Sequence, residues 1–253
     1  MKWSSSLAVG ANLSEAVARA AVALRAALGE EPVDLALAFV SHHHREVYGH
    51  VPDLVQEHLP ARVLAGCSGG AVLADGQEEE SRPAVALAAA RLPGVELTAR
   101  HLTTDNLPDD DAAPGIWRSW LGVTAAQPAL LALADPFSVA VEPLLTGLDY
   151  AFPGAPKVGG LASGGRKPRE NALFLNRDTY EEGLVLLSLS GNVVMDTVVA
   201  QGCRPIGRPL TVTRHDRNVL LEDFGHEAFV SGDPPAPIEA RYAEAVELLA
   251  VLH

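Results

Sequence analysis

Two segments that end in paired glycines decide the fold: Arg62-Val-Leu-Ala-Gly-Cys-Ser-Gly-Gly70 and Lys157-Val-Gly-Gly-Leu-Ala-Ser-Gly-Gly165. They align residue for residue, so that Ser163 stands at the place of Ser68 and Gly164 at the place of Gly69. The apolar runs 34–40 and 129–134, which precede them, keep the same spacing. Segments that recur in one order at one spacing are typical of an internal repeat. The sequence therefore predicts two copies of one structural unit.

Each predicted unit contains a helix, a strand, a second helix, a strand that leads into the glycine loop, and a hairpin. Apolar residues at helical spacing predict the helices, and continuous apolar runs predict the strands. The helices are expected over 15–28, 47–59, 116–121 and 141–152. The hairpins are expected from 85–92 with 95–102, around Pro93-Gly94, and from 184–189 with 193–200, around Gly191-Asn192.

A strand–helix–strand step gives parallel neighbours, whereas a hairpin gives antiparallel ones. We therefore expect an α/β fold of internally duplicated helix-strand-helix-strand-hairpin units, forming mixed sheets flanked by helices. The two repeats, about 1–104 and 115–202, make one domain over residues 1–202. A loop rich in Asp and Pro, 105–114, joins them, and residues 203–253 form a different C-terminal segment.

Composition and charge exclude several classes of protein. Of 253 residues 48% are hydrophobic, which is enough for a sizeable core. The 19 basic and 32 acidic residues give a net charge of −13, so the surface repels phosphate backbones and anionic lipid. We expect no nucleic-acid partner and no membrane partner. Cys67 and Cys203 cannot form a disulfide framework, and charged residues interrupt the N-terminal apolar stretches, so a cytoplasmic location is expected.

The glycine loops are the first candidate binding site, because ligands of α/β proteins lie at the carboxyl ends of parallel strands. Ser68, Gly69, Ser163 and Gly164 offer exposed amides and hydroxyls there, with Cys67 beside them. We expect the two loops to meet across a shared cleft that holds a small polar ligand. The alternative is that these small residues only allow the loops to pack against neighbouring strands.

Three further polar residues complete the candidate ligand site. Asp135 and Ser138 follow the strand 129–134, where a carboxylate suits a ligand amino group. The alternative role of Asp135 is to cap the helix that follows. Arg204, in Gly-Cys-Arg-Pro-Ile-Gly207, is a partner for a ligand carboxylate or else part of a surface ion pair.

An enzymatic alternative rests on Cys67, whose thiolate would be activated by a histidine of the run 42–44. No orienting Asn or Asp and no cysteine-hydrolase signature accompanies it, so we expect a non-enzymatic protein with no catalytic residue. Three successive histidines point in different directions, so we expect no metal site. No phosphate-binding glycine motif opens a helix, so no nucleotide cofactor is expected.

Five motifs stand in the order of a known family: Phe39-Val-Ser41, Leu64-Ala-Gly-Cys-Ser-Gly-Gly70, Leu133-Ala-Asp-Pro-Phe137, Val158-Gly-Gly-Leu-Ala-Ser-Gly-Gly165 and Gly202-Cys-Arg-Pro-Ile-Gly207. In this the sequence resembles the FIST sensory domain. Residues 1–202 resemble its N-terminal region, and 203–253 resemble the start of its C-terminal region, which is normally longer.

The resemblance implies a sensory module of intracellular signal transduction that binds a small polar metabolite, with amino acids the usual suggestion. The resemblance assigns no catalytic residue to this sequence. We therefore expect the output to pass through a separate signalling partner or the missing C-terminal FIST segment. A scaffold without a ligand remains an alternative, in which the C-terminal helix 238–252 binds a partner.

Overall fold

The computed structural model describes residues 1–109, 112–198, 210–216 and 219–225. The chain divides into two compact units, Met1–Thr197 and Val198–His253. The described part of the second unit is an antiparallel hairpin of β13 (Leu210–Asp216) and β14 (Val219–Gly225). The candidate site lies in the first unit.

The first unit contains four α-helices, two 3-10 helices and twelve strands among its described residues. The helical elements are α1 (Leu13–Leu28), η1 (His42–His50), α2 (Val51–His58), η2 (Thr104–Asn106), α3 (Pro114–Leu121) and α4 (Val141–Ala151). The strands are β1 (Lys2–Val9), β2 (Val33–Ser41), β3 (Ala61–Gly69), β4 (Val72–Ala74), β5 (Gln77–Glu79), β6 (Ala84–Arg91), β7 (Val95–Leu102), β8 (Ala129–Ala134), β9 (Lys157–Leu161), β10 (Leu173–Leu175), β11 (Asp178–Tyr180) and β12 (Leu184–Gly191).

Two mixed sheets form the centre of this unit. The larger has the order β1-β6-β2-β3-β10-β11, and the smaller has the order β7-β12-β8-β9. Strands β2 and β3 are parallel, as are β8 and β9, and the other pairs in these two sheets are antiparallel. The predicted α/β class with mixed sheets and flanking helices is confirmed.

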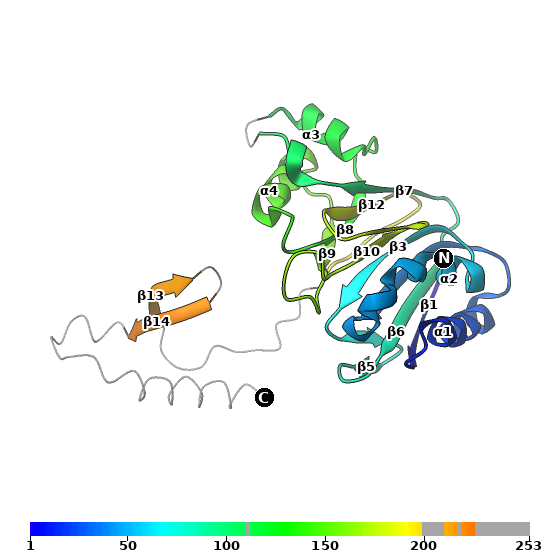
Figure 1. Ribbon diagram of the computed structural model, residues 1–253. Coiled ribbons are helices and arrows are strands. Elements are labelled where there is room, and N and C mark those ends of the chain that lie inside the picture. Colours follow the sequence, from blue (N-terminus) through cyan, green and yellow to red (C-terminus); the bar gives the residue numbers. More distant parts are fainter. Residues whose placement is uncertain (110–111, 199–209, 217–218, 226–253) are drawn as a thin grey trace. The chain divides into compact units, whose positions relative to one another are not determined.

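The layers follow from the alternation of side chains along each strand. In β2, Leu35 packs between the two sheets, whereas Ala36 and Ala38 face the core under α1 and α2. On the other side, α3 and α4 cover the smaller sheet around buried Trp117 and Leu144. Figure 1 shows the two pairs of helices on opposite outer sides of the paired sheets. Because β3 lies inside the larger sheet and is covered on both faces, it is buried at every residue from Val63 to Gly69.

The two hairpins predicted from the sequence are wrong. Strand β6 pairs with β1 and β2 in the larger sheet, whereas β7 pairs with β12 in the smaller one. The turn at Pro93-Gly94 therefore passes the chain from one sheet to the other instead of returning it alongside. After β12, residues 193–198 form no strand, and 199–200 lie outside the described residues.

The strand order of the smaller sheet repeats that of the first four strands of the larger sheet. Strand β7 takes the place of β1, β12 that of β6, β8 that of β2, and β9 that of β3. A repeat unit drawn from the structure would therefore begin with a strand, β1 or β7, and not with a helix as the sequence analysis expected. The origin of the two halves by duplication stays a prediction.

Candidate functional site

The two glycine loops contact each other directly. The Ser163 backbone N–H donates to the Ser68 carbonyl oxygen at 3.1 Å, and the Ser68 hydroxyl donates to the Ser163 carbonyl oxygen at 3.2 Å. The Gly70 N–H donates to the Ser163 hydroxyl at 3.0 Å. The two loops therefore meet edge to edge, as expected, and the shared cleft between them stays a prediction.

Ser68 and Ser163 have different surroundings, although they match in sequence. Ser68 is buried, and its hydroxyl also accepts from the Ala172 N–H at 3.1 Å. Ser163 is exposed. The Ser68 hydroxyl thus holds the segment before β10 to the end of β3, whereas the Ser163 hydroxyl lies at the surface.

Both loop glycines are required by close packing. A Cβ on Gly69 would lie 2.6 Å from the Ala71 carbonyl oxygen. Gly164 has a φ of +93°, and a Cβ there would lie 2.5 Å from the Cβ of His42. These positions therefore bring the backbone close to neighbouring backbone and to the first histidine of η1.

Asp135 belongs to a buried polar network beneath the loops. Its carboxylate accepts from the Ser138 hydroxyl at 2.7 Å, from the Phe137 N–H at 3.2 Å and from the Asn171 side-chain amide at 3.0 Å. The Asn171 side-chain oxygen in turn accepts from the Gly165 N–H at 2.8 Å. Asp135 therefore stabilises the turn after β8 and, through Asn171, links it to the second glycine loop.

The Cys67 thiol faces the apolar core between the two sheets, and the residue is only 5% exposed. Burial raises the pKa of Cys67 to about 12, so the thiol is protonated at neutral pH. The histidine run forms the start of η1: the rings of His42 and His43 lie 4.1 Å apart at a tilt of 33°, and His44 is buried. In the described ranges, no three His, Cys, Asp or Glu side chains gather closely enough to hold a metal ion. Arg204 lies outside the described residues.

A groove of about 580 Å³ lies beside the second glycine loop, and we call it the loop groove. Its lining residues are His42, Arg45, Gly164, Arg166, Lys167 and Glu170. Arg45 donates to the Gly164 carbonyl oxygen at 3.0 Å and forms an ion pair with Glu170 at 3.1 Å. The Nε of Arg45 is buried without a hydrogen-bond partner among the described residues.

The electrostatics of the loop groove are positive, although the whole chain is acidic. Arg45, Arg166 and Lys167 face one carboxylate, that of Glu170. A hydrogen bond from the Arg166 backbone N–H, helped by the charges of Arg45 and Lys167, lowers the pKa of Glu170 against the opposing effect of burial. Glu170 is therefore ionised at neutral pH, and the groove retains an excess of two positive charges.

A second groove, of about 790 Å³, shares Arg45 and Glu170 with the loop groove as lining residues. Tyr48, Asn171, His101 and Tyr180 are among its lining residues. Burial raises the pKa of Tyr48 to about 12, and its hydroxyl makes no hydrogen bond of normal geometry within the described ranges. His101 and Tyr180 stack with ring centroids 3.7 Å apart, which joins β7 of the smaller sheet to β11 of the larger one.

Four residues of this region were not predicted from the sequence: Arg45, Tyr48, Glu170 and Asn171. Arg45 lies just after the carboxyl end of β2, where the rule for parallel sheets would have found it. Glu170 and Asn171 lie in a segment without apolar period or turn motif. Of the predicted residues, the structure brings Ser68, Gly69, Ser163, Gly164, Asp135 and Ser138 into one region; it places Cys67 in the core below.

Comparison with known proteins gives one family. The model of the FIST N domain matches residues 34–222. An uncharacterized protein of Mycobacterium tuberculosis is 33% identical over 227 residues, which are 88% of this chain and 55% of that protein. An uncharacterized protein of Mycobacterium bovis is 30% identical over 224 residues, 87% of this chain and 54% of the relative. The chain thus spans about half the length of the curated relatives it matches. None of the helices that the structure describes is both long and apolar enough to cross a bilayer.

Proposed function

Because the chain belongs to the FIST N domain family, we propose that it is a sensory module that binds a small metabolite bearing a carboxylate, with amino acids as the first candidates. The family is associated with sensory signal transduction. The loop groove, at the end of the family's glycine motifs, is the proposed binding site.

The observation that carries this proposal is the charge of the loop groove. A guanidinium binds a carboxylate with charge-assisted hydrogen bonds, and the Arg45 guanidinium lines the groove, where the Gly164 carbonyl oxygen and the Glu170 carboxylate hold it in place. Arg166 and Lys167 add positive charge on the same rim. The volume of about 580 Å³ lies in the range of small-molecule sites.

The predicted site residues take two roles in this proposal. Gly164 lines the loop groove and offers a backbone contact to the ligand, whereas a contact from the exposed Ser163 hydroxyl beside it stays a prediction. Ser68, Gly69, Asp135 and Ser138 hold the shape of the loops. Cys67 supports the loop from the core, and Arg204 stays a prediction for a second carboxylate contact.

Signalling would follow from the position of the groove. Arg45 follows β2 of the larger sheet, whereas Arg166 and Lys167 follow β9 of the smaller sheet. A ligand held by all three would strengthen the contact between the sheets. A separate signalling partner, or a C-terminal FIST segment, would read that change.

The thiol-dependent alternative gains no support from the surroundings of Cys67. A nucleophilic cysteine needs a low pKa and access to substrate, whereas this thiol is buried with a raised pKa. We therefore do not assign a catalytic role.

The test is thermal unfolding of the full chain with each of the twenty amino acids and with small organic acids and their amides. A ligand present at one hundred times its Kd should add roughly 2.7 kcal/mol to the free energy of unfolding. The carboxylate should bind and its amide should not. Arg166→Gln and Arg45→Gln should each weaken binding.

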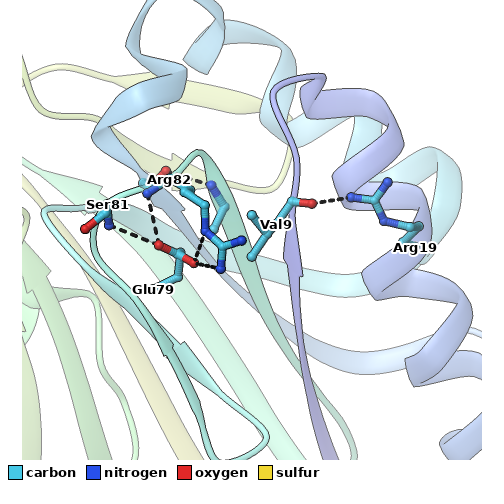
Figure 2. Close-up of polar contacts among 7 residues, drawn as sticks. Val9, Arg19, Glu79, Ser81 and Arg82 are labelled. Carbon is cyan, nitrogen blue, oxygen red and sulfur yellow. Dashed lines mark hydrogen bonds and ion pairs between the residues drawn. The ribbon is translucent and has the colours of Figure 1, made fainter.

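The matched control is Arg19→Gln. Arg19 is an exposed arginine that, like Arg45, donates to a backbone carbonyl, that of Val9, but does not line the groove (Figure 2). It should leave the ligand response unchanged. If no acid raises the unfolding temperature, or if the amides act equally, the carboxylate site is excluded.

A further inference from the structure

Strand β9 leaves one edge of the smaller sheet open. It pairs with β8 on one side, and no strand in the described part of the first unit pairs with its other side. The Ala162 N–H donates to the Ala134 carbonyl oxygen, on the side of β8. In a parallel pair, the N–H and C=O groups of successive residues point alternately to the two sides of the strand. Those of Gly159 and Leu161 therefore point toward the open side. An edge of this kind is a template for a further strand.

An apolar groove lies beside this edge, and we call it the α4 groove. Its volume is about 220 Å³, and it lies between α4 and the strands β8 and β9. Leu130, Ala132, Val141, Leu145, Val158 and Leu161 are among its lining residues. Leu145, Val158 and Leu161 are 47%, 44% and 50% exposed. Apolar side chains exposed together along a strand edge mark an interaction surface.

The larger sheet shows what covers the corresponding edge. There β3, which has the place of β9 in the strand order, pairs antiparallel with β10. Phe174 of β10 lies opposite Gly66 and is fully buried in the core under α2, with its ring 6.0 Å from that of Tyr48. A three-residue strand with one aromatic side chain therefore fills the groove between helix and sheet.

The two edges also match in backbone geometry. Gly66 lies opposite Ala38 in the parallel pair, and Gly159 lies opposite Ala132. A Cβ on Gly66 would lie 1.9 Å from the Ala38 carbonyl oxygen, and a Cβ on Gly159 would lie 1.9 Å from that of Ala132. By its position against the neighbouring parallel strand, Gly159 corresponds to Gly66, the residue that faces Phe174, although the sequence alignment of the two glycine segments places Leu161 there.

We propose that the open edge of β9 binds an antiparallel β-strand of a partner polypeptide, with a large apolar or aromatic side chain opposite Gly159 that enters the α4 groove. The strand supplies the missing peptide hydrogen bonds, and alternate side chains supply the specificity. Self-pairing of β9 in a second copy is less suited, because β9 contains no aromatic side chain and two of its five residues are glycine. This partner surface is independent of the ligand proposed for the loop groove.

The test uses the full chain and a labelled peptide with the sequence of residues 171–181, Asn-Ala-Leu-Phe-Leu-Asn-Arg-Asp-Thr-Tyr-Glu, which contains β10 and β11. Fluorescence anisotropy should detect saturable binding, and the Phe174→Ala form of the peptide should bind at least about tenfold more weakly. In the protein, Leu145→Glu should also weaken binding about tenfold or more, because the carboxylate would be desolvated by the peptide.

The matched control is Val22→Glu on α1, where an apolar residue that is 56% exposed, against 47% for Leu145, lies on another helix surface. It should leave peptide affinity unchanged. The proposal is overturned if the wild-type chain does not bind the peptide. It is also overturned if Leu145→Glu binds equally well, which would indicate exchange with the chain's own β10. Sedimentation that shows a dimer abolished by Leu145→Glu would assign the edge to a second copy instead.

Discussion

Ser68 and Ser163 show how one residue type serves two purposes at matched places in a sequence. The Ser68 hydroxyl satisfies a buried N–H of Ala172, and the Ser163 hydroxyl accepts an N–H at the surface. A buried donor without a partner costs free energy, whereas an exposed one is satisfied by water. The Ser68 hydroxyl should therefore contribute more to stability than the Ser163 hydroxyl, although the two residues match in sequence.

Ser68→Ala should lower the free energy of unfolding by about 1–3 kcal/mol, because the Ala172 N–H loses its partner. Ser163→Ala should cost less than about 1 kcal/mol. Urea denaturation of both variants measures the difference. Equal losses would contradict the difference in burial between the two hydroxyls.

Cys67 should react slowly with thiol reagents. With a pKa of about 12, about one thiol in ten thousand is ionised at pH 8, and burial limits access further. In a Cys203→Ser background, an aromatic disulfide reagent should label Cys67 only after unfolding in guanidinium. Rapid labelling of the native protein would restore the thiol-dependent alternative.

Glu79 should make stability depend on pH. Its carboxylate binds the Arg82 guanidinium and the N–H groups of Ser81 and Arg82 (Figure 2). The Arg82 side chain is the largest cause of a pKa below the ordinary value of 4.5. A carboxyl group with a lowered pKa stabilises the fold above its unfolded-state pKa, and this stability is lost as the pH falls through the folded-state pKa.

Glu79→Gln should therefore destabilise the protein at pH 7, and its difference from wild type should shrink as the pH falls below about 4.5. Urea midpoints measured across this range test the prediction. Glu78→Gln, an exposed neighbour in β5, is the control and should change little. If the stability difference between Glu79→Gln and wild type grew as the pH fell, the prediction would be contradicted.

At the scale of elements, α3 and α4 pack through a glycine. A Cβ on Gly147 would lie 2.1 Å from the buried ring of Trp117, so the two helices approach only because no side chain separates them. Gly115, at the start of α3, has no atom within 4 Å of the same added Cβ. The two helical glycines thus form a natural pair for comparison.

Gly147→Ala should destabilise the protein by roughly 1–3 kcal/mol through overpacking. Gly115→Ala should be neutral or stabilising by up to about 1 kcal/mol, because alanine favours the helix. Thermal unfolding of both variants compares them. If Gly147→Ala left the stability unchanged, the Trp117 ring would be able to move aside without loss of stability, which would contradict the prediction.

Sequence patterns identified several elements because their signals are local. The apolar runs of β2 and β8 and the helical spacing of α1 and α4 follow from side-chain periodicity alone. The turn at Pro93-Gly94 was also recognised, but a turn signal does not say which sheet the next strand joins. Strands β10 and β11 have three residues each, too few for a period to be read.

The candidate site was predictable only in part, for the same reason. Ser68 and Ser163 stand in a repeated motif, so the sequence marks them. Arg45, Glu170 and Asn171 come together through η1 and an irregular segment, and their contacts depend on how the two sheets are placed. Residues that meet only in the tertiary structure show no regular spacing in the sequence, so no sequence pattern predicts their contacts.

At the scale of the first unit, each half of the chain contributes strands to the sheet that is formed mainly by the other half. Strands β10 and β11 follow β9 in the chain but complete the larger sheet, and β7 precedes the linker but forms part of the smaller one. The core between the sheets draws residues from both, among them Leu35, Val63, Leu133 and Leu187. The halves are therefore parts of one cooperative fold.

Fragments 1–110 and 111–253, produced separately, should not fold, because each would expose the core between the sheets; the first would lack β10 and β11 of the larger sheet, and the second would lack β7 of the smaller one. Mixed or co-expressed, they should form a one-to-one complex with the secondary structure of the intact chain. Circular dichroism and size-exclusion chromatography test this. A stable, monomeric 1–110 fragment would contradict it.

Because β10 and β11 belong to the larger sheet, that sheet can be completed only late in the synthesis of the chain. During synthesis, β3 is available some hundred residues before its outer neighbour leaves the ribosome, since residue 67 pairs with residue 173. Until then its edge is unprotected, and the N-terminal strands remain in an incomplete state that chaperones would recognise. Translation speed between residues 70 and 180 should therefore govern the yield of folded protein more than speed in the preceding or following codons.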